Sequence, residues 1–274
     1  MRFLISLCEI ALPLLYFATI WVYARAFFSK IRLAERLTTP LLLSTLLAHG
    51  FYLAIRTAEL RHPPITSVFE IFSLMAFTVA LVYSSIEWRL RIKSTGYFIL
   101  MLPFFFQLVS SILIREDSEV SPILQSNLLG FHVSSALLGY AAITISAVYG
   151  LLYLMLYHEI KSSRFGVVYQ RLPNLESLER MSFTATVFGF VFLTIAIIVG
   201  IIWMARVTQE VSYTDPKLFG TFVIWLLYAA GLTAKSLRHW QGRRMMVLSV
   251  FGFATAMFSM TVVNIFLSGF HKFY

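Results

Sequence analysis

Two histidines, His132 and His271, are the residues whose type and placement point most directly to chemistry. Each stands where a long apolar run meets the aqueous phase. Histidine is costly inside hydrocarbon, and two neutral imidazoles can saturate haem iron as axial ligands, which leaves no open position for oxygen chemistry. If the fold brings both residues to one membrane face, the pair predicts a bis-histidine haem site. The alternative for each is an interfacial side chain hydrogen-bonded to water or to a carbonyl.

The composition defines the class of protein that must position this pair. Of 274 residues, 59% are hydrophobic and 13% are charged, with a mean hydropathy of +0.79. Soluble domains are nearer a quarter charged, so we expect a polytopic membrane protein without a separate soluble domain. The single cysteine, Cys8, excludes an internal disulfide, a CxxC redox pair and a multi-cysteine metal cluster. The net charge of +9 is better explained by basic loops that set membrane topology than by nucleic-acid binding.

Eight apolar runs are long enough to cross a bilayer: 4–28, 40–56, 67–87, 96–114, 128–157, 182–204, 217–235 and 245–268. They predict an all-α bundle of about eight transmembrane helices that forms a single integral membrane domain, 1–274, with N-terminal spans at 1–60 and a core at 61–274. Lys30, Arg32 and Arg36 follow the first run, which favours a retained anchor over a cleaved signal peptide.

The basic residues predict the orientation. Most of the 22 Lys and Arg residues fall in alternate loops: Lys30, Arg32, Arg36; Arg89, Arg91, Lys93; Lys161, Arg164, Arg171, Arg180; Lys235, Arg238, Arg243 and Arg244. The positive-inside rule places these loops in the cytoplasm and both termini outside. Arg56 is among the minority assigned to the outer side. His62, His132 and His271 then meet at the outer face of what we expect to be a bacterial cytoplasmic membrane.

Small residues recur on the run that His132 heads, at steps of three or four: Ser135, Gly139, Ala142, Ser146 and Gly150. Such steps keep residues on one helix face, and small residues let membrane helices pack closely. His132 extends this stripe and is therefore predicted to point into the bundle. Asn264 precedes His271 by about two turns on one face, which is a weaker signal because Gly269 intervenes.

Two outer loops carry helix-start signals. Asp215-Pro216 is typical of a helix N-terminus, and Thr66 or Ser67 is predicted to cap the helix that contains Glu70. His49 lies inside the second run, where an ionisable group is a functional candidate by default. With no evident histidine partner, it is better interpreted as a neutral, hydrogen-bonded core residue. Glu9 is a second buried acid, but two isolated groups do not make a proton path.

Five segments in this order resemble the cytochrome c assembly family, the haem-handling membrane proteins of CcsA, CcmC and HemX type. The segments are HPPITSVFE at 62–70, FHVSS at 131–135 with Gly139-Tyr140, LPNLESLER at 172–180, YTDPK at 213–217, and NIFLSGFH at 264–271. The likeness runs from about residue 49 to the C-terminus. No single motif is highly specific, but their order and topology together are.

The resemblance implies a haem b at the outer face, with His132 and His271 as the iron ligands. It also implies contacts from the outer loop, with Trp203, Tyr213, Asp215 and Lys217 as candidates, and it keeps His62, Glu70 and His49 as further candidates. The implied partners are haem, the lipid bilayer, and another membrane protein of cytochrome c assembly or a haem-biosynthesis enzyme. In the HemX branch that enzyme is glutamyl-tRNA reductase. No nucleic acid is expected.

The chain departs from the synthases of this family. Ser212 and Thr214 stand in place of two loop tryptophans, Leu218 replaces a glutamate, and Leu232-Thr-Ala-Lys235 lies where a synthase has a histidine. These differences favour the HemX-like branch and a protein that is not itself an enzyme, holding or handing over haem or modulating its synthesis. Two alternatives stay open: a haem-free scaffold or regulator with a decayed site, and a subunit of a cytochrome c synthase that acts as a haem lyase with a partner.

Overall fold

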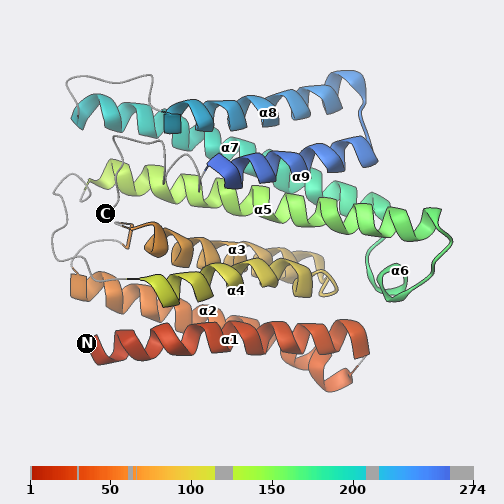
Figure 1. The fold of residues 1–274 in the computed structure, drawn as a ribbon, viewed down its shortest axis with the longest axis horizontal. Helices are drawn as coiled ribbons and strands as arrows, with labels where there is room; N and C mark the ends of the chain where they lie inside the picture. The colour runs from red at the N-terminus through yellow and green to blue at the C-terminus, as the bar shows by residue number, and fades with distance from the viewer. Residues whose placement is uncertain are drawn as a thin grey trace. The chain divides into compact units, whose positions relative to one another are not determined.

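The computed structural model describes residues 2–29, 31–60, 64–65, 67–114, 126–207 and 216–259. Within these ranges the ordered elements are helices, and the chain divides into two compact units, 1–126 and 127–274 (Figure 1). Seven described helices are long and apolar enough to span a bilayer, so the expected polytopic helical bundle is confirmed. The eighth expected run is represented by α9 (Arg243–Phe258), and its end lies outside the described residues. The division at residue 60 stays a prediction.

Unit 1 is a four-helix bundle of α1 (Arg2–Ser29), α2 (Arg32–Leu60), α3 (Val68–Leu90) and α4 (Gly96–Leu113). Short connections make consecutive helices antiparallel neighbours, and α4 returns to pack on α1. Ser67 caps α3 by accepting a hydrogen bond from the Glu70 backbone N–H at 3.2 Å, as predicted for this position.

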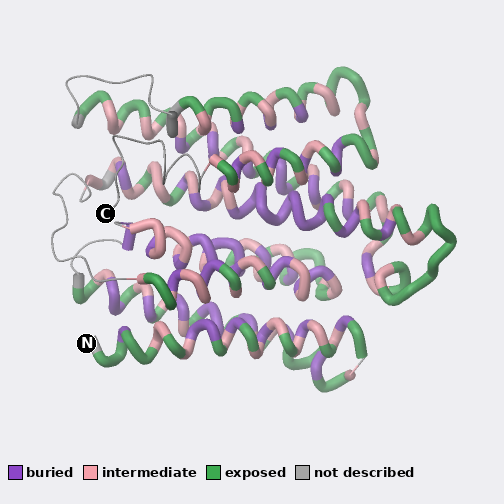
Figure 2. Tube along the Cα trace, in the orientation of Figure 1, coloured by how far each residue is buried: buried purple, intermediate pink, exposed green. Residues whose placement is uncertain are grey.

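Unit 2 is arranged around α5 (Asn127–Lys161), which packs against α7 (Leu175–Val207) and α9. The residues from 141 to 150 are all buried, which makes α5 the central helix of the unit (Figure 2). α8 (Pro216–Arg238) lies against α7 and α9 and begins at the proline that the Asp-Pro pair predicted. The small-residue stripe of α5 is buried throughout, from Ser135 to Gly150.

Glycines let α5 and α7 approach closely. A Cβ added to Gly139 would lie 2.9 Å from the Leu193 side chain, and one added to Gly189 would lie 2.8 Å from Ile143 and 3.2 Å from the Gly139 carbonyl oxygen. Contacts this short are unavailable to any residue with a side chain, so the two helix backbones meet directly at these positions.

Helices α5 and α7 extend beyond the predicted apolar runs at their shared end. α5 continues to Lys161, and α7 begins at Leu175 because the Asn174 side chain accepts a hydrogen bond from the Ser177 N–H at 2.9 Å. A short helix, α6 (Val167–Arg171), lies between them. The apolar pattern marks where a helix crosses hydrocarbon, and polar turns beyond that limit are set by capping instead.

Candidate functional site

His132 lies near the start of α5 and faces α7. Its Nδ1 atom is 2.8 Å from the backbone carbonyl oxygen of Ala196. A carbonyl oxygen can only accept, so Nδ1 carries the proton in this bond. In a neutral imidazole the lone pair is then on Nε2, the atom through which histidine commonly ligates a metal. The carbonyl bond is the interaction expected of an interfacial histidine, and it also prepares the ring for a ligand role.

Gly200 makes this approach sterically feasible. It stands one helical turn after Ala196 on α7, and a Cβ at this position would lie 2.7 Å from His132 Nδ1 and 2.8 Å from Cε1. Any side chain there would therefore displace the imidazole. His132 and Gly200 are far apart in the sequence, so the sequence alone did not predict this contact.

Trp203 continues the same face of α7, three residues beyond Gly200. Its indole Nε1 is buried and has no hydrogen-bond partner among the described residues. Buried polar atoms in native proteins usually have a hydrogen-bond partner. This N–H is therefore suited to donate to a bound ligand instead of to another group of the protein. The oriented imidazole of α5 thus lies against the face of α7 that carries the indole donor.

Most of the other candidate residues for this site lie in parts of the chain that the structure does not describe. His62, Tyr213, Asp215 and His271 lie outside the described residues, and Lys217 falls in the first turn of α8. The pairing of His132 with His271 is therefore still a prediction.

His49 is a satisfied core residue in unit 1, as its interpretation from sequence favoured. It is fully buried, with Nδ1 3.0 Å from the Tyr16 hydroxyl and Nε2 3.0 Å from the Ser73 hydroxyl. Both ring nitrogens are engaged, so the side chain is not arranged as a metal ligand. In the part of the chain that the structure describes, no group of three or more His, Cys, Asp or Glu side chains could hold a metal ion.

Glu70 lies in a buried ionic cluster that sequence reasoning missed. Arg56 donates from Nε and Nη2 to Glu70 Oε1 at 3.1 and 3.0 Å, and from Nη1 to Glu9 Oε1 at 3.1 Å. The Arg56 side chain is only 2% exposed, so Arg56 is an interior residue of α2 and not a loop residue, while the side of the membrane on which it lies stays a prediction. The signal available was Glu9, an acid in an apolar run that required a partner.

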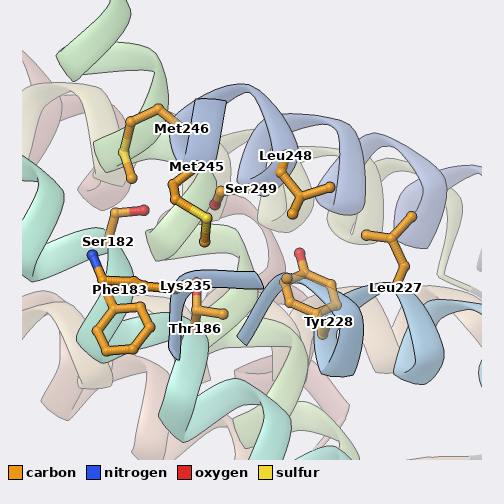
Figure 3. A pocket seen from close by; sticks show the side chains of 11 residues that line it. Ser182, Phe183, Thr186, Leu227, Tyr228, Lys235, Met245, Met246, Leu248 and Ser249 are labelled. Carbon is orange, nitrogen blue, oxygen red and sulfur yellow. The ribbon is translucent and has the colours of Figure 1, made fainter. Parts of the chain in front are cut away.

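Ser146 is a second missed feature. Predicted only as a small residue on the α5 stripe, it is a buried hydroxyl that lies 2.7 to 3.0 Å from the side-chain oxygens of Ser182, Thr186 and Ser249. A cavity of about 20 Å³ adjoins this cluster among α7, α8 and α9 (Figure 3). That volume suits about one water molecule, so the cavity is no organic-ligand site.

The fold and this geometry define a class: a polytopic helical membrane protein that holds an oriented imidazole near the end of its central helix. The sequence model of the Cytochrome C assembly protein family matches residues 7–271. The chain belongs to this family, and the match begins well upstream of the region in which the motifs were found.

Individual relatives agree with this membership. The chain is 28% identical over 242 residues to the cytochrome c biogenesis protein CcsA of Guillardia theta, covering 81% of this chain and 80% of that protein. It is 25% identical over 309 residues to CcsA of Microcystis aeruginosa, covering 95% and 94%. Protein HemX of Bacillus subtilis is 31% identical over 155 residues, covering 57% of this chain and 54% of HemX.

Proposed function

We propose that the protein binds haem b at the outer face of the membrane, with His132 and His271 as axial ligands, and that it holds or hands over this haem without being an enzyme itself. The observation that carries the proposal is the hydrogen bond from His132 Nδ1 to the Ala196 carbonyl, which fixes the tautomer that a metal ligand needs. Bound haem would supply a redox-active iron with both axial positions filled.

The chain's own residues have defined tasks in this proposal. Ala196 and Gly200 hold the His132 ring in place, and Trp203 offers an N–H donor on the same helix face. Tyr213, Asp215 and Lys217 belong to the connection that leads from α7 into α8 and would border the site. The distribution of Lys and Arg supports an outer location for this end of α5 and α7.

The proposal is tested on protein purified from haem-replete cells. We expect an absorption spectrum with a Soret band and the sharp bands of a reduced low-spin haem b. His132→Ala and His271→Ala should each abolish or shift these bands, and added imidazole should restore them in part. His158→Ala and His239→Ala are matched controls, because both side chains are exposed, and they should leave the spectrum unchanged. If both ligand variants retain the wild-type spectrum, the site assignment is wrong.

A second candidate is supported by the relatives. CcsA proteins named for cytochrome c biogenesis match over four fifths of the chain or more, whereas the HemX match covers little more than half. This coverage supports a role as one subunit of a cytochrome c synthase, with a partner that supplies the missing loop tryptophans. Deletion of the gene should then abolish covalent haem staining of c-type cytochromes. A HemX-like modulator would instead alter the amount of glutamyl-tRNA reductase and leave that staining intact.

The haem-free alternative rests on Ser212 and Thr214, which stand where the family's synthases have tryptophans. It predicts no Soret band in protein purified from haem-replete cells.

A further inference from the structure

Unit 1 contains a column of polar side chains that occupies the interior of its four helices. The column has a carboxylate near each end of α3, Glu70 and Glu87, both 2–3% exposed. At about 1.5 Å per residue they are roughly 25 Å apart along the helix axis, close to the ~30 Å hydrocarbon thickness of a bilayer. The interior polar groups therefore extend over most of the span.

The first end of the column is the Arg56 cluster. Its guanidinium binds Glu70 and Glu9, and the Tyr52 hydroxyl lies 3.4 Å from Glu9 Oε1. Glu9 is 21% exposed, so the cluster reaches the surface of the unit on this side.

The middle of the column is centred on His49. Its Nε2 contacts the Ser73 hydroxyl, which donates to Gln107 Oε1 at 2.9 Å, while its Nδ1 contacts the Tyr16 hydroxyl. One helical turn separates Ser73 from Glu70 on α3, and one separates His49 from Tyr52 on α2.

The far end is centred on Glu87. Its carboxylate accepts hydrogen bonds from the hydroxyls of Tyr23 at 2.5 Å, Thr39 at 2.6 Å and Tyr83 at 2.9 Å. Among the residues that the structure describes, Glu87 forms no ion pair. Thr38 and Lys93, which are 3.2 Å apart, lie beside this cluster and connect it to the exposed end of the unit.

A hydroxyl pair fills the interval between the middle and the far end. Thr19 on α1 and Thr45 on α2 are hydrogen-bonded at 2.8 Å. Thr45 precedes His49 by one turn, and Thr19 precedes Tyr23 by one turn. Every break in the column is therefore about one helical turn, about 5.4 Å along the helix axis, which a relayed proton would cross by side-chain rotation.

Helix adhesion does not by itself account for this arrangement. Hydroxyl and amide pairs suffice to bind membrane helices to one another, whereas carboxylates are expensive in a membrane interior. Here Glu9 and Glu70 share the Arg56 guanidinium, whereas Glu87 accepts hydrogen bonds only from hydroxyls among the described residues. The His49 imidazole lies between the two groups, hydrogen-bonded to hydroxyls. An imidazole can accept a proton at one nitrogen and release one from the other, which is how histidine serves in proton relays.

We propose that unit 1 conducts protons across the membrane along this column. A proton enters at the Glu87 cluster and passes through Thr19–Thr45 and the Tyr16 hydroxyl to His49. It leaves at the Glu9–Arg56–Glu70 cluster, or travels in the reverse direction. No electron or other group is transferred, and each side chain regains its initial state. This function is independent of haem, because the column lies wholly in unit 1.

The test uses the full-length protein in liposomes of phosphatidylcholine and phosphatidylglycerol that enclose the pH dye pyranine. A valinomycin-induced potassium potential drives the protons, and the initial rate of dye response reports the flux. We expect wild type to exceed protein-free liposomes, and His49→Gln and Glu87→Gln to reduce the excess at least about tenfold. Gln keeps hydrogen-bonding capacity but cannot relay a proton. Glu176→Gln, an exposed acid in unit 2, is the matched control and should conduct like wild type.

Size-exclusion chromatography and thermal unfolding establish that each variant is folded. Tyr16→Phe removes one hydroxyl without a change of charge, so it gives a milder variant that should also slow the flux. The proposal is overturned if wild type conducts no faster than protein-free liposomes. It is also overturned if folded His49→Gln and Tyr16→Phe conduct like wild type, in which case the column is structural. Neither result bears on the haem spectrum, so failure here is distinguishable from failure of the haem proposal.

Discussion

Replacing Gly200 with alanine tests whether His132 is held by α7 as described. The new Cβ would lie 2.7 Å from His132 Nδ1, so the ring must retreat by roughly 0.7 Å to reach ordinary van der Waals contact. Overpacking of this kind costs about 1–3 kcal/mol, and the strained hydrogen bond to Ala196 adds about 1 kcal/mol. The higher helix propensity of alanine offsets about 1 kcal/mol of this destabilisation. The free energy of unfolding should therefore fall by about 1–3 kcal/mol.

Gly130 supplies a matched control two residues before His132. A Cβ added there meets nothing within 4 Å, so Gly130→Ala should be neutral or stabilise the protein by up to about 1 kcal/mol. Unfolding in detergent micelles titrated with sodium dodecyl sulfate measures both variants. A double-mutant cycle then isolates the contact: in a His132→Ala background the penalty of Gly200→Ala should vanish. An undiminished penalty in that background would refute the steric reasoning.

Two further stability predictions follow from the buried polar groups. Arg56→Met leaves two carboxylates without their cation and should cost about 3–5 kcal/mol in the same titration, whereas Lys161→Met, at an exposed site, should change stability by less than about 0.5 kcal/mol. Ser146→Ala removes a hydroxyl shared by three partners and should cost about 1–3 kcal/mol, against less than about 0.5 kcal/mol for exposed Ser134→Ala. Equal losses in a variant and its control would contradict the burial argument.

The sequence predicted the features that depend on local pattern. Apolar runs gave the spanning helices, Ser67 and Pro216 marked two helix starts, and the small-residue stripe placed His132 against a neighbouring helix. These signals are local because hydrophobic periodicity and capping act within a few residues.

The missed features depend on which helices meet. In the sequence, Arg56 resembles a cation near a loop, and only the packing of α1 and α3 brings Glu9 and Glu70 to it. Likewise, Glu87 is a buried carboxylate bonded to hydroxyls only because packing places Tyr23 and Thr39 beside it. Pairings between distant positions leave no periodic trace in one sequence. For the same reason, the sequence did not predict the contacts that Ala196 and Gly200 make with His132.

The glycine contacts between α5 and α7 make the placement of His132 a property of helix spacing. Gly139 and Gly189 bring the two backbones together in mid-helix, and the imidazole reaches the Ala196 carbonyl only because the gap is this narrow. A substitution such as Gly189→Ala, more than a turn from the histidine, would push the helices apart and lengthen the bond to Ala196. The hydrogen bond between His132 and Ala196 thus depends on glycines that do not contact the histidine.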